Sequence, residues 1–281
     1  MKLVHSVAEM HRLSRAARSR GKRLGFVPTL GALHEGHLSL VRAARKKSDL
    51  VAASIFVNPT QFGPHEDFAK YPRTLENDCA LLEREGVELV FAPPVEEMYP
   101  QGVVTWVVVE CLSDRLCGKS RPGHFRGVST VVAKLFHIVE PDVAFFGQKD
   151  AAQVAIIQRM VRDLNMPVAI EVCPIVRESD GLAISSRNAY LNPEERKSAL
   201  VLHRSLTRVQ KLFAGGETDS AKLAAAAKLE FAAEPAVRLD YVEVVDPETL
   251  EPEAKVTKRT LVAVAAFVGQ TRMIDNIVLE T

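Results

Sequence analysis

An alternation of short apolar runs with longer amphipathic stretches constrains the fold of this chain more than any other sequence feature. The apolar runs are expected to be strands at residues 24–28, 50–57, 87–92, 103–109, 142–146 and 168–173. Helices are expected between them at residues 37–47, 74–85, 128–139 and 150–164. Because successive β-α units of this kind build a parallel sheet, the sequence predicts a doubly wound α/β domain over residues 1–175.

The first 23 residues are rich in arginine, a composition that is also typical of organellar transit peptides. However, Leu3, Val7, Met10 and Leu13 recur at helical spacing and lead directly into the first strand. We therefore expect a folded helix whose basic run, residues 12–23, lies in solvent.

The last third of the chain has a different pattern. Helices are expected at residues 193–213 and 219–231, with Gly215 and Gly216 between them, and strands at residues 240–245, 260–267 and 273–278. Helices followed by neighbouring strands predict a smaller α+β domain over residues 176–281. We expect the boundary between Ile175 and Pro193.

Composition excludes several classes of protein. With 47% hydrophobic and 25% charged residues, the 281-residue chain is neither disordered nor of low complexity. A formal net charge of +1 gives no whole-molecule reason to expect a nucleic-acid or membrane-surface partner. The four cysteines are scattered, which favours reduced thiols and a cytoplasmic location. Apolar runs such as residues 261–268 are shorter than the ~20 residues that a membrane helix needs.

The loop at residues 28–37 is the first candidate site, because ligands of open α/β sheets bind at the carboxyl ends of the strands. Gly31 and Gly36 permit close backbone approach, the following helix offers free N–H groups, and His34 and His37 can donate to phosphate oxygens. These features indicate a phosphate site; a glycine-rich turn with ordinary histidines is the alternative. A zinc site is disfavoured, because the spacing is not His-Glu-x-x-His.

Three further loops carry polar side chains. The amides of Asn58 and Gln61 suit a hydroxyl or carboxylate substrate, although Asn-Pro also opens plain turns. Lys149 stands at an expected helix start, where its positive charge is opposed to the helix dipole. A bound anion between the lysine and the helix end would make this position favourable; the alternative is a solvated surface lysine. Residues 177–188 place two serines beside Arg187, which predicts a flexible loop able to close on a triphosphate, or else a linker.

Some familiar motifs are absent. Residues 118–120, Gly-Lys-Ser, match the tail of a P-loop, but Ser113 stands where its first glycine is required, and residues 121–123 prevent the expected helix. Neither G-x-G-x-x-G nor G-x-S-x-G occurs, which argues against a dinucleotide dehydrogenase and a serine hydrolase. The basic segment at residues 121–127 is expected to be a loop that can cover a site.

Taken together, the motifs resemble those of the pantoate–β-alanine ligase family. In the family's order and spacing, the chain contains P-T-L-G-A-L-H-E-G-H, F-V-N-P-T-Q-F, R-P-G-H-F-R-G-V-S-T-V-V, F-F-G-Q-K-D and D-G-L-A-I-S-S-R-N. The resemblance implies a Rossmann-like nucleotidyltransferase core, with the first motif as the HIGH-type phosphate signature. The last motif stands where the KMSKS loop does in class I synthetases.

The resemblance also implies a two-step reaction and its ligands. Pantoate and ATP form pantoyl adenylate and pyrophosphate, and the amine of β-alanine then displaces AMP. Mg²⁺ is expected to be held mainly by the triphosphate, with no metal bound by the protein itself. A homodimer through the N-terminal domain is implied as well.

By the same resemblance, the phosphate donors expected to act in catalysis are His34, His37, Lys149, Ser185, Ser186 and Arg187. The residues expected to contact ATP are Leu30, Gly31, Ala32, Leu33, His34, Glu35, Gly36, His37, Gly147, Gln148, Lys149, Asp150, Val176, Ile184, Ser185, Ser186 and Arg187. Gln61 is expected to meet pantoate and β-alanine, Gln153 pantoate, and Asn58 the adjoining groups. Tyr71, Arg121 and His124 are further substrate-binding candidates.

Some positions depart from the family pattern. Leu30 and Ile184 stand where methionine is usual, and both keep an apolar contact. Ala151 and Ala152 replace a frequent Tyr-Gln, which is expected to alter packing beside the substrate.

Two alternative functions stay open. One is another nucleotidyltransferase of the same fold, which Gln61 and Gln153 argue against. The other is a non-catalytic nucleotide-binding regulator, which would not need the full set of phosphate donors.

Overall fold

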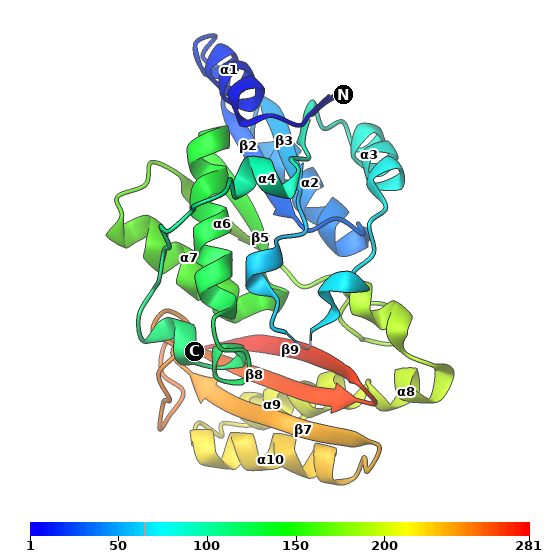
Figure 1. The fold of residues 1–281 in the computed structure, drawn as a ribbon. Helices are drawn as coiled ribbons and strands as arrows, with labels where there is room; N and C mark the ends of the chain where they lie inside the picture. Colours follow the sequence, from blue (N-terminus) through cyan, green and yellow to red (C-terminus); the bar gives the residue numbers. More distant parts are fainter. Residues whose placement is uncertain (65) are drawn as a thin grey trace. The chain divides into compact units, whose positions relative to one another are not determined.

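The structure is a computed structural model that describes residues 1–64 and 66–281, and its chain divides into two compact units (Figure 1). The first comprises Met1–Asp114, Gly118–Gly147 and Ile156–Pro174. The second comprises Arg115–Cys117, Gln148–Ala155 and Ile175–Thr281. The segment Gln148–Ala155, which carries Lys149 and Gln153, therefore packs with the C-terminal part of the chain.

The first unit is built on a six-stranded sheet in the order β1-β4-β3-β2-β5-β6, and every pair of neighbours is parallel. The strands are β1 (Lys2–Val4), β2 (Leu24–Thr29), β3 (Leu50–Ile55), β4 (Leu89–Phe91), β5 (Val143–Gly147) and β6 (Ala169–Cys173). Runs such as Leu24–Thr29 are buried almost throughout, as expected for a strand covered on both faces. The predicted doubly wound α/β architecture is confirmed.

Helices connect these strands. They are α1 (Val7–Arg18), α2 (Glu35–Lys47), α3 (Leu75–Arg84), α4 (Val95–Met98), α5 (Cys117–Ser120), α6 (His124–Val139) and α7 (Ala151–Asp163). The short 3₁₀ turns are η1 (Pro59–Gln61), η2 (Asp67–Ala69), η3 (Leu112–Asp114) and η4 (Gln148–Asp150). Leu40, Val41 and Ala44 of α2 pack with Val27 and Val51 of the sheet in one buried cluster.

The strand order reverses at β2, and this reversal indicates where a ligand is expected to bind. The chain runs from β2 through β3 to β4 on one side, then returns to β5 on the other side of β2. Because such crossovers are right-handed, α2 and α3 cover one face of the sheet and α6 the other (Figure 1). Ligands of open sheets bind at the carboxyl ends of the strands at such a switch point. The loops after β2 and β5 both begin there.

The predicted strand at residues 103–109 is wrong. No residue of this segment joins a described strand, and the side chains of Val104 and Val108 are 83% and 52% exposed. The sheet position beside β4 is instead occupied by β1, a strand that the sequence analysis assigned to the N-terminal helix. The helix itself is confirmed and begins at Val7, where the Ser6 hydroxyl accepts a hydrogen bond from the Glu9 N–H.

Two helix predictions need correction. Residues 124–127 do not form a loop, because α6 begins at His124, directly after Gly123 at φ +81°. The predicted helix at residues 193–213 is divided into α8 (Pro193–Ser198) and α9 (Val201–Ala214). Between them, Leu200 N–H donates to Lys197 O and Leu202 N–H to Ala199 O, and these shorter hydrogen-bonded turns interrupt the α-helical pattern.

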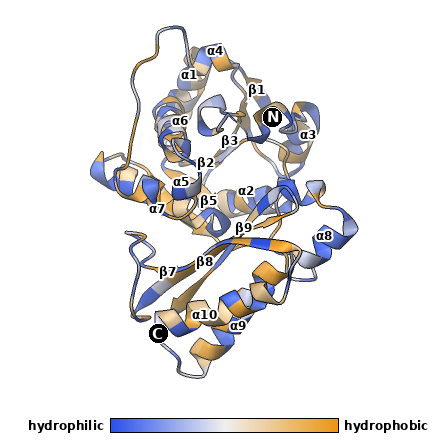
Figure 2. Cartoon of the chain, turned by 60° about the horizontal axis from the view of Figure 1, so that its bottom comes forward, coloured by the Kyte–Doolittle hydropathy of each residue, from blue (hydrophilic) through white to orange (hydrophobic). Residues whose placement is uncertain are grey.

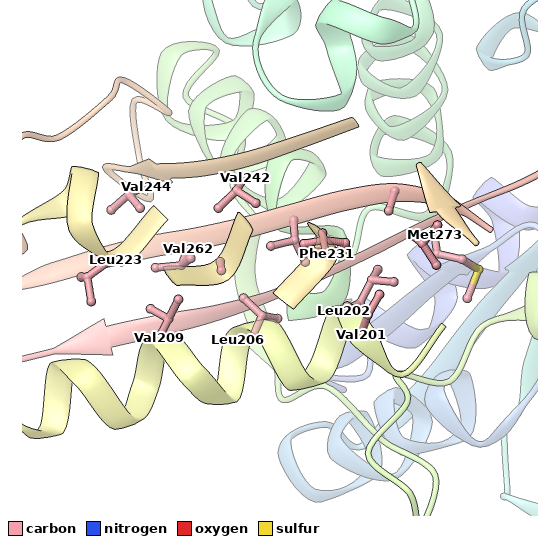
Figure 3. Close-up of a cluster of buried hydrophobic side chains, with 14 of the residues drawn as sticks. Val201, Leu202, Leu206, Val209, Leu223, Phe231, Val242, Val244, Val262 and Met273 are labelled. Atoms are coloured by element: carbon pink, nitrogen blue, oxygen red, sulfur yellow. The ribbon is translucent and has the colours of Figure 1, made fainter. Parts of the chain in front are cut away.

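The second unit contains an antiparallel sheet in the order β7-β8-β9, formed by β7 (Val237–Val245), β8 (Arg259–Val268) and β9 (Thr271–Glu280). In Figure 1, α9 and α10 (Ser220–Ala232) lie along one face of this sheet. Leu202, Leu206 and Val209 of α9 point into its core at helical spacing (Figure 3). Figure 2 shows β8 as mainly hydrophobic. The predicted smaller α+β fold is confirmed.

Two further properties concern the chain as a whole. Within the part of the chain that the structure describes, no helix is both long and apolar enough to cross a membrane. The cysteines Cys79, Cys111, Cys117 and Cys173 are present as thiols rather than as disulfides.

Candidate active site

The loop between β2 and α2 is held by a buried carboxylate of α3. Asp78 is fully buried, and its Oδ2 and Oδ1 accept hydrogen bonds from the N–H groups of Ala32 and Leu33, both at 2.9 Å. Gly31 and Ala32 have φ values of +85° and +50°, the left-handed region, which costs about 1 kcal/mol for a residue with a Cβ. Asp78 therefore fixes a strained backbone conformation immediately before the two histidines.

His34 and His37 lie together at the start of α2. Their ring centroids are 4.0 Å apart, and the His34 N–H donates to His37 Nδ1 at 3.4 Å. Both imidazoles therefore stand beside a helix N-terminus, where the partial positive charge favours an anion. The negative charge of Glu35 at this helix start is balanced by an ion pair with Arg42. The hydrogen bond from Arg42 also lowers the pKa of the Glu35 carboxyl.

The predicted substrate amides also meet in the first unit. Asn58 Nδ2 donates to Gln61 Oε1 at 3.1 Å and to the Gly127 carbonyl at 3.2 Å. Asn58 is fully buried and Gln61 nearly so. A Cβ on Gly127 would lie 2.4 Å from the Thr60 carbonyl oxygen, so only glycine lets α6 approach η1 this closely. The contact between α6 and η1 thereby sets the orientation of the Gln61 carboxamide.

Arg121 and His124 support the backbone of the same turn. Arg121 Nη1 contacts His124 Nε2 at 2.9 Å, and His124 Nδ1 contacts the Gln61 carbonyl oxygen at 2.8 Å. Since the guanidinium can only donate, His124 accepts at Nε2 and donates at Nδ1, as a neutral imidazole does. Burial raises the pKa of Glu66, but its ion pair with Arg121, together with the Gly63 backbone and His124, brings the net pKa below the usual value. The structure thus connects both predicted residues to Gln61.

Two tyrosines lie beside these groups. Tyr71, a predicted substrate residue, is buried with its ring 5.9 Å from that of Phe62. The hydroxyl of Tyr99, which the sequence analysis did not select, is 3.3 Å from Thr60 Oγ1. Burial raises the pKa of Tyr99. It therefore stays a protonated phenol at neutral pH.

In the second unit, the turn at Gln148–Asp150 carries the predicted lysine. Lys149 is half-buried, Asp150 is exposed, and Gln153 is half-buried in the first turn of α7. Asn276 of β9 donates through Nδ2 to the carbonyl oxygens of Gln148 and Lys149, both at 3.0 Å. The backbone around Lys149 is therefore fixed by β9. Ala151 and Ala152, which depart from the family pattern, are both buried.

The predicted loop at residues 177–188 begins as a tight hairpin. Ile184 N–H donates to Val176 O at 3.0 Å, and Arg177 forms an antiparallel bridge with Ala183. Ser185 Oγ accepts from the Arg187 N–H at 3.3 Å and so caps the 3₁₀ turn η5 (Ser186–Tyr190). The base of this loop is ordered by its own hydrogen bonds, and the structure brings Ser185, Ser186 and Arg187 together at its end.

Several residues that shape the site are not predicted from the sequence. Asp78 occupies a position on the buried face of α3, four residues before Leu82, where helical periodicity calls for an apolar side chain. Asp275 and Asn276 interrupt an otherwise largely apolar strand. In all three cases the sequence places a polar residue at a position expected to be buried, and this is the signal from which they could have been found.

No group of three His, Cys, Asp or Glu among the described residues, 1–64 and 66–281, is arranged to hold a metal ion.

Comparisons with known proteins agree with this geometry along the whole chain. A family model described as pantoate–β-alanine ligase matches residues 2–278. Pantothenate synthetase of Koribacter versatilis is 60% identical over 280 residues, which cover 100% of this chain and 96% of that protein. The crystal structure of pantothenate synthetase from Thermus thermophilus matches with a TM-score of 0.93 at 49% identity, covering 99% of both chains.

A third relative carries ligands. The crystal structure of pantoate–β-alanine ligase from Francisella tularensis, complexed with "Beta-gamma ATP" and β-alanine, matches with a TM-score of 0.80 at 32% identity. The match covers 99% of this chain and 97% of that one. With a family model and close relatives matched over nearly its full length, this chain belongs to the pantoate–β-alanine ligase family.

Proposed function

We infer that the chain ligates pantoate to β-alanine with ATP, and we propose that it does so in two steps. The observation that carries the ligase activity is the family match over residues 2–278, which includes both units and every candidate loop. The position of the histidine loop after β2, at the switch point of the sheet, agrees with nucleotide binding there.

In the first step, a carboxylate oxygen of pantoate attacks the α-phosphorus of ATP. The bond from that phosphorus to the oxygen bridging the α- and β-phosphates breaks, so pyrophosphate leaves and pantoyl adenylate forms. In the second step, the β-alanine amine attacks the pantoyl carbonyl carbon, the bond to AMP breaks, and the amine loses a proton. Neither step needs a nucleophile from the protein.

The first step sets one anion against another, so positive donors must stabilise the charge that develops on the phosphates. We assign this role to His34 and His37 of the first unit and to Lys149 and Arg187 of the second, with Ser185 and Ser186 as neutral donors. The remaining proposed ATP contacts are residues 30–33, 35–36, 147–148, 150, 176 and 184. Imidazole titrates near neutral pH, so His37 can also protonate the leaving phosphate.

Gln61 is the proposed centre of substrate recognition. Its carboxamide, oriented by Asn58, can donate to and accept from the hydroxyl and carboxylate groups of pantoate and from β-alanine. Because Arg121 and His124 contact the Gln61 backbone, we propose that they act by positioning this turn. Gln153 is proposed to bind pantoate, and Tyr71 to line the same substrate region.

Three further properties belong to this proposal. Mg²⁺ enters as part of the nucleotide substrate, coordinated mainly by phosphate oxygens. The enzyme is a homodimer that associates through its N-terminal domain, residues 1–175, and residues 176–281 form a lid domain. It works in the cytoplasm, where cysteine thiols stay reduced.

Omitting one substrate at a time tests the reaction. We expect AMP to form at the full rate only with ATP, pantoate and β-alanine together, and pantoate-dependent exchange of pyrophosphate into ATP without β-alanine. Unchanged AMP release without pantoate would contradict the assignment and favour another nucleotidyltransferase. Tight ATP binding with no turnover under any combination would favour a non-catalytic regulator.

The phosphate donors are tested separately. His37→Ala and Lys149→Ala are each expected to lower kcat by about 100-fold or more, because each removes a donor to the transition state. Lys46→Ala is the matched control, since Lys46 is an exposed lysine in the last turn of α2. Near-wild-type kcat in both His37→Ala and Lys149→Ala would show that these residues have other roles.

A further inference from the structure

Two adjacent polar residues lie buried in β9, the edge strand of the antiparallel sheet. Asp275 and Asn276 are 2% and 3% exposed, although neighbours such as Met273 and Ile277 belong to the apolar core or pack against it. Burying a carboxylate and a carboxamide is unfavourable unless their hydrogen bonds are satisfied. Here the partners of both side chains belong to the two segments of the second unit that carry proposed phosphate donors.

Asn276 uses both ends of its carboxamide on the turn that carries Lys149. Its Nδ2 donates to the carbonyl oxygens of Gln148 and Lys149, both at 3.0 Å. Its Oδ1 accepts from Gln148 Nε2, also at 3.0 Å. Two of these hydrogen bonds therefore fix the backbone from which the Lys149 side chain projects, and the third holds the Gln148 side chain beside it.

Asp275 acts on the other segment, through Arg177. Its Oδ2 and Oδ1 accept from Arg177 Nη1 and Nη2 at 2.7 and 2.9 Å, the two-pronged arrangement that fixes an arginine most firmly. Arg177 Nη1 also donates to the Gly181 carbonyl at 3.0 Å, within the hairpin that leads to Arg187. Asp275 Oδ1 further accepts from the Asn276 N–H at 2.8 Å, which links the two side chains.

We propose that Asp275 and Asn276 are positioning residues for adenylate formation. They hold the Lys149 turn and the hairpin at residues 176–184, which leads to Arg187, at a fixed mutual geometry. This inference rests on the proposed roles of Lys149 and Arg187. One β-strand can fix both segments because Asp275 and Asn276 are neighbours in sequence. Preorganisation of this kind matters, since a displacement of about 1 Å at a reacting group can cost about 100-fold in rate.

The test for Asn276 is the variant Asn276→Leu, which keeps the side-chain size but removes the three hydrogen bonds. We expect kcat for pantoate-dependent pyrophosphate exchange to fall by about 10-fold or more, with KM for pantoate nearly unchanged. Thr260→Val is the matched control, because Thr260 is a buried residue of neighbouring β8 whose hydroxyl bonds to Glu253 Oε2 at 2.5 Å. It should lose stability without loss of kcat.

A double-mutant cycle with Lys149→Ala separates positioning from general destabilisation. If Asn276 acts through the Lys149 side chain, the double variant is no slower than Lys149→Ala alone. Full additivity, or a normal kcat for Asn276→Leu at a temperature where it is folded, would overturn the proposal. If Asn276→Leu does not fold, Asn276→Asp replaces it, because it keeps the acceptor for Gln148 but places an oxygen against the two carbonyl groups.

The matching cycle for Asp275 pairs Asp275→Asn with Arg187→Ala. Non-additive losses of kcat are expected here as well, whereas additive losses would remove Asp275 from the proposal. Arg177→Lys serves as a second route if Asp275→Asn is unfolded, since it keeps the charge but loses the two-pronged contact. A wild-type rate for Lys149→Ala or Arg187→Ala alone would contradict the proposed function of that residue, whatever the β9 variants do.

Discussion

Asp78 shows how a single buried carboxylate can determine the shape of a binding loop. Its two oxygens accept the N–H groups of Ala32 and Leu33, while the loop passes through two residues with positive φ. The glycines and histidines of this loop predict a binding site, but they do not explain why the backbone holds that conformation. The reason lies 45 residues further along the chain, in the contact between Asp78 and Leu33, which no local pattern contains.

Asp78→Asn is expected to destabilise the fold and weaken ATP binding. The amide offers one acceptor oxygen where two N–H groups need one each, so one buried N–H faces an NH₂ group, at a cost of about 1–3 kcal/mol. We expect KM for ATP to rise, measured alongside urea unfolding. Glu76→Gln, an exposed change in the same helix, is the control. Equal KM values for both variants would show that the loop keeps its shape without Asp78.

Glu66 contributes a pH-dependent part of the stability. Burial raises its pKa, but Arg121, together with the Gly63 backbone and His124, lowers it, and the net pKa lies below the usual value of 4.5. A carboxyl whose folded-state pKa is lowered stabilises the fold above its unfolded-state pKa, and loses that contribution as the pH falls through the folded-state value. We expect urea unfolding to show wild type more stable than Glu66→Gln at pH 7, with the difference shrinking below pH ~4.5. A difference independent of pH would contradict this ion pair.

At the scale of elements, the contact between α6 and η1 connects packing to substrate recognition. Gly127 is the point of closest approach, and its carbonyl accepts from Asn58. The sequence motif Arg-Pro-Gly-His-Phe-Arg-Gly was expected to be a covering loop, but from His124 onward it is the first turn of a helix packed on the Gln61 turn. The error arose because residues 121–123 disfavour a helix locally, whereas a glycine at Gly123 permits the helix to begin directly afterwards.

Gly127→Ala is therefore expected to displace η1. The new Cβ would lie 2.4 Å from the Thr60 carbonyl oxygen, so the fold should lose about 1–3 kcal/mol of stability. KM for pantoate and β-alanine should rise by about 10-fold, because the Gln61 carboxamide moves with the turn. Gly63→Ala is the control, since its Cβ would meet Glu66 only at ordinary contact distances of 3.6 Å and more. Unchanged KM values in Gly127→Ala would contradict the link.

Strands could be predicted from the sequence where they form continuous buried apolar runs. Leu24–Thr29 and Leu50–Ile55 are buried runs that the apolar pattern identified within two residues. The run at residues 103–109 is also apolar, but it joins no described strand and Val104 and Val108 face solvent, because β1 occupies the sheet position beside β4. Strand pairing depends on which segment reaches an edge, and that is decided by tertiary structure rather than by local pattern.

At the scale of the whole molecule, the sequence predicted two architectures in the right order, a parallel α/β sheet and then a smaller α+β fold. It did not indicate that Gln148–Ala155 packs with the second unit, because this segment follows β5 without a change in composition. The consequence concerns function: Lys149 shares a compact unit with Arg187, while His34 and His37 belong to the other. The four proposed donors thus come from both parts of the chain.

The central claim, that the reaction proceeds through an adenylate of pantoate, is tested most directly by oxygen transfer. Pantoate labelled with ¹⁸O in its carboxylate is supplied with ATP, Mg²⁺ and β-alanine, and the products are analysed by mass spectrometry. Attack of the carboxylate on the α-phosphorus predicts that AMP acquires one ¹⁸O atom for each pantothenate formed. Label in inorganic phosphate or pyrophosphate, or AMP without label, would contradict the account.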